Sequence, residues 1–275
     1  MRGPFSNISV QQSRAMTQAV GFPLPKRTTV VQAEDIAAQW ITVNDIAPSK
    51  VLLYLHGGGY VQNTPKTHHA MAARIALRAG VRVLYVDYRL APEHPFPAAL
   101  DDAVSAYKWL LAQKITPDNI IFAGDSAGGG LVVALMLKLQ AEHLALPAAA
   151  ILLSPWCDLT MNGQSALEDR DPIYSRRIFL KFAHLYAAGV PLDDPGLSPL
   201  NGTFKQMPPI LIQVGERELL YSDAVGLSDR LREADSQVHL SIYPGLWHVW
   251  QVYPSWIVPE SQTAIDEIGG FIRSL

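Results

Sequence analysis

Five short, almost continuously apolar segments limit what this chain can fold into more than any other feature of its sequence. They are rich in valine, isoleucine and leucine and occupy residues 51–56, 81–88, 119–124, 149–154 and 210–215. A strand reads as unbroken apolar sequence when both of its faces are covered, which is typical of parallel sheets. Segments with helical periodicity lie between most of them, at 67–80, 97–113 and 223–234. This alternation predicts an α/β fold with a mostly parallel sheet and helices on both faces.

The remaining segments depart from this alternation. A sixth strand is predicted at 238–245, and residues 28–45 read as two antiparallel strands at one edge of the sheet. Residues 1–25 look like a helix that ends at a proline-rich segment, and residues 157–207 are too long for a simple connection. The middle of the second region, 175–188, is aromatic-rich and helical in period. We expect residues 1–25 and 157–207 to form a cap over one end of the sheet.

Composition excludes several classes of function. The 275 residues suit one large α/β domain, and a net charge of −3 without a basic block argues against nucleic-acid binding. The sequence has no run of 18 apolar residues and no apolar core of signal-peptide length at its start, so we expect no membrane span and a cytoplasmic location. Cys157 is the only cysteine, which rules out an internal disulfide, and we expect its thiol to be buried and inert.

Four glycines surround one serine in GDSAGGG, residues 124–130, directly after a predicted strand. Glycine weakens both strands and helices, so such a cluster needs a structural reason. The spacing Gly124-x-Ser126-x-Gly128 between a strand and an apolar helix makes a sharp turn that strains the serine backbone and exposes its hydroxyl. The N-terminus of the following helix also directs free N–H groups at this point. We therefore predict that Ser126 is a nucleophile.

A second glycine run, Gly57-Gly58-Gly59, follows His56 at the end of the predicted strand 51–56. Without side chains, backbone N–H groups can approach a bound carbonyl oxygen, and preorganised donors of this kind stabilise a developing oxyanion. We therefore expect this loop to form part of an oxyanion hole. His56 is expected to shape the loop by hydrogen bonding rather than to act as a base.

Three sequence blocks, taken together, resemble a known family. They are HGGG at 56–59, VDYRLAPEHPFPAALDD at 86–102 and GDSAGG at 124–129. In this order and spacing they resemble the hormone-sensitive-lipase branch of the α/β-hydrolase superfamily, the bacterial carboxylesterases called family IV. The resemblance covers most of the chain, from about Val51 to the C-terminal helix.

This resemblance implies an α/β-hydrolase fold with an eight-stranded sheet, a helical cap and a serine–acid–histidine triad. It implies that the backbone amides of Gly58, Gly59 and Ala127 form the oxyanion hole. It also implies that Asp125 and the RLAPEH block at 89–94 hold loops in place. A homodimer is possible, on the basis of the family alone.

The triad base must lie late in the chain, because the order in this superfamily is serine, acid, histidine. After residue 215 the only histidines are His239, which alternates within a predicted strand, and His248, which lies in a loop past the last strand. We assign His248 as the base. Alignment of QVGERELLYSDA with the family's acid motif assigns Glu218 as the acid. Glu216 and Asp223 are its competitors, although we expect Asp223 to cap the following helix.

Other conspicuous residues receive structural or minor roles. We expect Tyr60 and Trp156 to line the substrate pocket. His68 and His69 are adjacent and lack a carboxylate-rich partner motif, so we do not expect a metal site. No nucleotide-binding glycine motif occurs, and the expected chemistry needs no cofactor.

These assignments predict ester hydrolysis through an acyl-enzyme on Ser126, and the resemblance implies short-chain acyl esters of small molecules as substrates. Two alternatives stay open at the level of the sequence. One is an amidase or lactonase that uses the same triad. The other is a non-catalytic ligand receptor on the same fold, because fold alone does not determine function.

Overall fold

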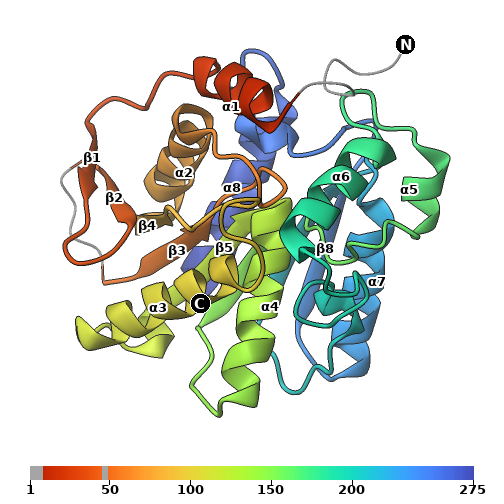
Figure 1. The fold of residues 1–275 in the computed structure, drawn as a ribbon. Helices are drawn as coiled ribbons and strands as arrows, with labels where there is room; N and C mark the ends of the chain where they lie inside the picture. The colour runs from red at the N-terminus through yellow and green to blue at the C-terminus, as the bar shows by residue number, and fades with distance from the viewer. Residues whose placement is uncertain (1–8, 45–48) are drawn as a thin grey trace.

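An eight-stranded sheet forms the centre of the molecule in the computed structural model, which describes residues 9–44 and 49–275 (Figure 1). Its strands lie in the order β1-β2-β4-β3-β5-β6-β7-β8. The pairs β1–β2 and β2–β4 are antiparallel, and every later pair is parallel. The strands are β1 Thr28–Gln32, β2 Ala38–Val43, β3 Val51–Leu55, β4 Arg82–Val86, β5 Ile120–Asp125, β6 Ala149–Leu153, β7 Ile210–Gly215 and β8 Val238–Tyr243.

Helices cover both faces of this sheet. The α-helices are α1 Val10–Ala19, α2 Pro65–Ala79, α3 Ala98–Ala112, α4 Ala127–Ala141, α5 Gln164–Glu168, α6 Arg176–Ala187, α7 Tyr221–Glu233 and α8 Glu260–Ser274. Short 3₁₀ turns lie at η1 Pro117–Asn119, η2 Pro199–Asn201 and η3 Trp250–Val252. Helices α2 and α8 pack on one face and α3, α4 and α7 on the other. Among the described residues, no helix combines the length and apolar character needed to cross a bilayer.

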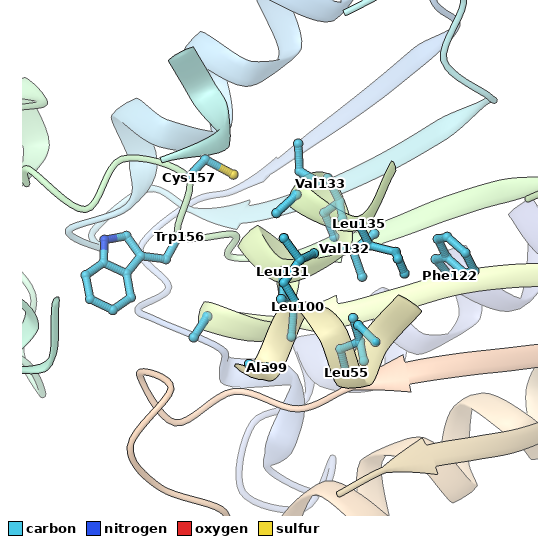
Figure 2. Packing of buried hydrophobic residues seen from close by; sticks show 14 of the residues in the cluster. Leu55, Ala99, Leu100, Phe122, Leu131, Val132, Val133, Leu135, Trp156 and Cys157 are labelled. Carbon is cyan, nitrogen blue, oxygen red and sulfur yellow. The ribbon is translucent and has the colours of Figure 1, made fainter. Parts of the chain in front are cut away.

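The buried strands show why their sequences are continuously apolar. Along β3, Leu53 and Leu55 pack into the core under α3 and α4, whereas Leu52 and Tyr54 pack into the core under α2 and α8. All five residues of β3 are buried, as are all five of β6. Figure 2 shows Leu55 of β3 and Phe122 of β5 packed with leucines and valines of α4. The predicted α/β sheet and the antiparallel pair at its edge are therefore confirmed.

The two regions that interrupt the alternation are largely irregular. Residues 9–25 contain α1, which begins at a capping box formed by Ser9 and Gln12. Residues 157–207 contain the short helix α5 and the longer α6, which occupies most of the aromatic-rich segment. Figure 1 shows α1 and α6 toward the same, upper end of the molecule. Residues 1–8 of the predicted cap lie outside the described residues, and the division of the chain into a sheet domain and a cap stays a prediction.

Close backbone contacts at the start of α4 explain the cluster of glycines there. Leu55 and Gly124 are neighbours in register, so the loops after β3 and β5 leave the sheet side by side. A Cβ atom on Gly124 would overlap the carbonyl of Gly128, and one on Gly128 would overlap the carbonyl of Leu55. Both obstacles are backbone atoms, which cannot rotate away. Glycine at these positions is therefore required by packing.

We expect Gly128→Ala to lower the free energy of unfolding by roughly 3 kcal/mol, because the added methyl group must displace the backbone of β3. The matched control is Gly270→Ala in α8, an exposed site where a Cβ atom meets nothing within 4 Å. That variant should be more stable than the parent by about 0.5–1 kcal/mol, since alanine favours helix over glycine. Urea denaturation of both variants measures the difference; equal stability for the two would contradict this account of α4.

Candidate active site

Ser126 lies at the tight turn between β5 and α4. Its backbone has φ 53° and ψ −122°, a conformation that residues with a side chain rarely adopt. Hydrogen bonds on both sides hold it there: Ser126 N–H donates to the carbonyl of Leu153 at 2.8 Å, and its own carbonyl accepts from the N–H of Trp156 at 2.9 Å. The strained serine backbone predicted from the sequence is thus present. Hydrogen bonds with β6 and with the loop after it hold this conformation in place.

A continuous hydrogen-bonded chain runs from this serine to a histidine and a glutamate. His248 Nε2 lies 2.9 Å from Ser126 Oγ, and His248 Nδ1 lies 2.7 Å from Glu218 Oε2. All three side chains are buried. The structure therefore brings together the three residues that we assigned from the sequence, although they are up to 122 positions apart in the chain.

The glutamate is itself held by two donors. Glu218 Oε1 accepts hydrogen bonds from the backbone N–H of Gly215, at 2.5 Å, and from the hydroxyl of Ser154, at 2.9 Å. The Ser154 hydroxyl also accepts from the N–H of Val249, the residue after His248. Ser154 therefore connects the acid to the histidine loop. Sequence reasoning missed it; the only signal was a serine directly after the strand β6, which neighbours both β5 and β7.

The environment of His248 suits a base that becomes transiently protonated. Burial on its own would lower the pKa of the imidazole, but the hydrogen bond and charge of Glu218 outweigh it, so the pKa is raised. The rings of Tyr174 and Phe179 pack edge-on against the imidazole, with centroids 5.4 and 5.6 Å away. An imidazole placed in this way can take the proton of the serine hydroxyl and later return it.

The competing residues do not reach His248. Glu216 is exposed and accepts a hydrogen bond from the N–H of Gly245. His239 is also exposed and faces Glu267. The structure thus leaves Glu218 as the carboxylate that meets the imidazole.

The expectation that Asp223 caps α7 is wrong. The N-cap of α7 is Leu220, and Asp223 lies within the first turn of the helix. Its carboxylate instead accepts the backbone N–H groups of Cys157 and Asp158, both at 2.8 Å. Burial raises the pKa of Asp223 to about 8. Asp223 therefore holds the loop that follows β6, a role that no local sequence pattern indicates.

The glycine loop after β3 presents two backbone N–H groups next to Ser126. Gly58 and Gly59 have φ values of 119° and 63°, which favour glycine. Within residues 9–44 and 49–275, the N–H groups of Gly58, Gly59 and Ala127 donate to no acceptor. Gly58, Gly59 and Ser126 all line one cavity. The three amides therefore have no competing acceptor in the described part of the chain, and Ala127 directly follows Ser126.

His56 and the RLAPEH block both contact this segment, since the N–H of Ala91 donates to the carbonyl of Tyr60, the residue after Gly59, at 2.9 Å. His56 is buried, its ring stacks on Tyr88 at 4.1 Å, and its Nδ1 lies 2.7 Å from the carbonyl of Gly57. Burial lowers the pKa of His56 to about 3, so the ring is neutral. Arg89 at the start of the block pairs with Asp102.

The cavity above Ser126 has a volume of about 270 Å³. Its walls come mainly from the two irregular regions and from the histidine loop. The residues that line it are Thr17, Val20, Phe22, Gly58, Gly59, Gln62, Thr64, Thr67, His68, Asp125, Ser126, Ile173, Tyr174, Ile178, Phe179, Phe182, His248, Val249, Val252 and Tyr253. The three residues of α6 in this wall, at 178, 179 and 182, follow helical spacing, which is the signal that could have identified them.

The expectation that Tyr60 and Trp156 line the pocket needs correction. Both are buried beneath it: Tyr60 stacks on Tyr186 at 3.9 Å, and Trp156 packs edge-on against Phe179 at 4.9 Å. Neither residue is among those that line the cavity. Figure 2 shows Trp156 and Cys157 beside the buried residues of α4. The thiol of Cys157 is buried, as predicted, and burial raises its pKa.

Comparison with known proteins agrees with this geometry. A family model for the alpha/beta hydrolase fold matches residues 52–252. An acetyl-hydrolase of Streptomyces hygroscopicus is 38% identical over 247 residues, which cover 89% of this chain and 82% of that protein. An esterase of Acinetobacter venetianus is 34% identical over 254 residues, which cover 91% and 82% of the two chains.

Solved structures agree as well. The crystal structure of an esterase from the bacterial hormone-sensitive lipase family has a TM-score of 0.94 to this chain at 38% identity, covering 98% of this chain and 93% of that one. An esterase/lipase from an uncultured bacterium has a TM-score of 0.93 at 36% identity, covering 100% and 94%. The chain therefore belongs to the α/β-hydrolase superfamily and, within it, to the hormone-sensitive-lipase branch of carboxylesterases.

Proposed function

We propose that this carboxylesterase hydrolyses short-chain acyl esters through an acyl-enzyme, with Ser126 as nucleophile, His248 as base and Glu218 as the acid that orients it. One observation carries the proposal: the hydrogen-bonded chain from Ser126 Oγ through both nitrogens of His248 to Glu218. Because Glu218 accepts at Nδ1, it selects the tautomer whose Nε2 can accept the serine proton.

The reaction proceeds in two halves. His248 takes the proton of Ser126 while Oγ attacks the ester carbonyl, and the amides of Gly58, Gly59 and Ala127 bind the resulting oxyanion. The alcohol leaves with the proton from His248, and the acyl group stays on Ser126. Water then attacks the acyl-enzyme with His248 again as base, which releases the acid and restores the serine.

The size of the cavity supports short acyl chains. Its volume of about 270 Å³ lies just below the range of pockets that hold drug-sized ligands, roughly 300–1,000 Å³. Phe182 of α6 lies directly against Gly59, where a Cβ atom would overlap its ring. An aromatic ring next to a proposed oxyanion donor leaves little space for a long chain beside the reacting carbonyl. The acetyl-hydrolase among its relatives agrees with this preference.

The central test is Ser126→Ala with nitrophenyl esters from acetate to decanoate. We expect kcat to fall by about 10⁴-fold or more, because the acyl-enzyme cannot form. Ser105→Ala, at an exposed serine of α3, is the matched control and should keep the parent rate. Parent-level hydrolysis by Ser126→Ala would overturn the proposal. Parallel assays with nitroanilides and lactones separate an esterase from an amidase or lactonase with the same triad.

Glu218→Gln tests the role of the acid through rate and pH together. Activity requires neutral His248, so it is present above the pKa of this residue and lost as pH falls through it. Because that pKa is raised, we expect the acidic limb of kcat/KM in the parent to lie above about 6.5, the value of a free imidazole. Removing the charge of Glu218 should move the limb to lower pH and reduce kcat by roughly 10³–10⁴-fold.

Glu216→Gln is the control for this experiment, because Glu216 is an exposed carboxylate two positions away that does not meet His248. Its rate and its acidic limb should match the parent. A Glu218→Gln enzyme with an unshifted limb and nearly full kcat would show that another group orients His248.

Phe182→Ala tests the limit on acyl length. Removal of the ring opens space beside Gly59, so we expect the preferred nitrophenyl ester to lengthen by two or more carbons while acetate hydrolysis falls. His184→Ala, at an exposed position of the same helix, is the control and should keep the parent preference. An unchanged chain-length profile in Phe182→Ala would place the limit elsewhere in the cavity.

A further inference from the structure

A second pair of histidine and carboxylate, His68 and Asp125, lies beside the nucleophile, and the mechanism above does not use it. His68 Nε2 of α2 is 3.2 Å from Asp125 Oδ2, in the residue directly before Ser126. The two side chains are only 6% and 3% exposed. Both residues line the cavity. A buried pair of ionisable groups is costly unless its charges are well satisfied, so its presence next to Ser126 calls for a reason.

Asp125 holds the glycine loop that carries the proposed oxyanion donors. Its Oδ1 accepts the backbone N–H of Gly57 at 2.9 Å and the hydroxyl of Tyr54 at 2.6 Å. A Cβ atom on Gly57 would overlap Asp125 Oδ2, so the carboxylate lies directly against the loop. Gly57 directly precedes Gly58. The position of the proposed donors therefore depends on this carboxylate, and the two donors to Oδ1 favour its ionised form.

The ionised carboxylate also creates a problem for the chemistry. A negative charge in a buried site repels the oxyanion that forms on the substrate nearby. The negative charge of Asp125 strengthens the hydrogen bond that positions Gly57, but the same charge raises the energy of the transition state. A neighbouring cation would remove this conflict without disturbing the hydrogen bonds to Oδ1.

His68 is placed to supply that cation. Its Nε2 faces the carboxylate of Asp125, and its Nδ1 lies 3.1 Å from the backbone carbonyl of Thr64 and 2.9 Å from the hydroxyl of Thr64. A carbonyl oxygen can only accept, and so can an ionised carboxylate. Each ring nitrogen of His68 thus has an acceptor within hydrogen-bond distance, the carbonyl of Thr64 at Nδ1 and the carboxylate of Asp125 at Nε2, so an imidazolium at this position can donate from both nitrogens. The charge and hydrogen bond of His68, with the donors Tyr54 and Gly57, outweigh burial and lower the pKa of Asp125.

We propose that His68 is a positioning residue, held as an imidazolium, that neutralises Asp125 and so lets this carboxylate fix the Gly57–Gly59 loop for oxyanion binding. His68 acts through Asp125 and not on the substrate. The inference rests on the proposed function, because it assigns a role in binding the oxyanion of that reaction.

The test is a double-mutant cycle of His68→Leu and Asp125→Asn. His68→Leu leaves the buried carboxylate unpaired, so we expect kcat to fall roughly 10²-fold with KM changed less than about threefold. Asparagine at 125 keeps an acceptor for Gly57 and Tyr54 but carries no charge. The double variant should therefore recover at least about tenfold in kcat over His68→Leu. Recovery of this kind is not expected if His68 only fills space.

The adjacent His69 is the matched control. It packs edge-on against Tyr85 and does not face Asp125, so His69→Leu should stay within about twofold of the parent kcat. Thermal unfolding of each variant verifies that it is folded. A His68→Leu enzyme with parent kcat, or a double variant no better than the single one, would overturn the proposal.

A measurement on the parent protein keeps the proposal testable even if a variant does not fold. In ¹⁵N-labelled protein at pH 7, both ring nitrogens of His68 should carry protons and give imidazolium shifts, whereas neutral-ring shifts would overturn the assignment. The spectrum does not depend on turnover. Failure of the proposed function would appear instead as full activity in Ser126→Ala, so the two failures are distinguishable.

Discussion

The close backbone contact between the start of α4 and the end of β3 is the constraint on which the site depends. Glycine at 124 and 128 lets the strand β5, the helix α4 and the carbonyl of Leu55 meet without side chains between them. This contact makes the turn at Ser126 tight enough to strain the serine backbone. It also brings the glycine loop after β3 next to the serine hydroxyl. A wider turn would separate the serine from the amides beside it.

Three buried carboxylates near the carboxyl ends of the strands show how differently one charge can be satisfied. Glu218 meets a histidine and two neutral donors, Asp125 meets a histidine on its other side, and Asp223 accepts two backbone N–H groups without a cation. Burial raises the pKa of Asp223 to about 8, whereas for Asp125 the charge and hydrogen bond of His68 help to outweigh burial and the pKa is lowered. The contrast follows from the partners, because a carboxylate without a neighbouring cation bears the cost of burial unaided.

The sequence was sufficient for those parts of the site that are encoded locally. A few neighbouring residues are enough to recognise the strand before Ser126, the glycines around it and the histidine late in the chain. The structure places these three features next to one another. Glu218 needed the resemblance to a family, because three carboxylates lie within eight positions. Its partner Ser154 could not be found, since that contact depends on the order of strands in the sheet.

The walls of the cavity were the least predictable part. Tyr60 directly follows the HGGG motif and Trp156 follows the strand β6, but the first ring stacks on Tyr186 and the second packs against Phe179, so both are buried in the core. Which side of the backbone a ring occupies is decided by neighbours far away in the chain. The fold could be predicted because its signal is repeated in six strands, whereas each wall residue depends on a single contact.

The attachment of α1 has a consequence for how such a protein can change over evolutionary time. Arg14 of this helix donates hydrogen bonds to the carbonyls of Val61 and Ala91 and forms an ion pair with Glu93. Val20 and Phe22, just after the helix, line the cavity. The reacting groups lie in turns and loops directly after the strands β5, β7 and β8, whereas much of the cavity wall comes from segments outside the alternation of strands and helices. Substitutions in those segments can diversify selectivity among descendants while the inherited chemistry stays intact.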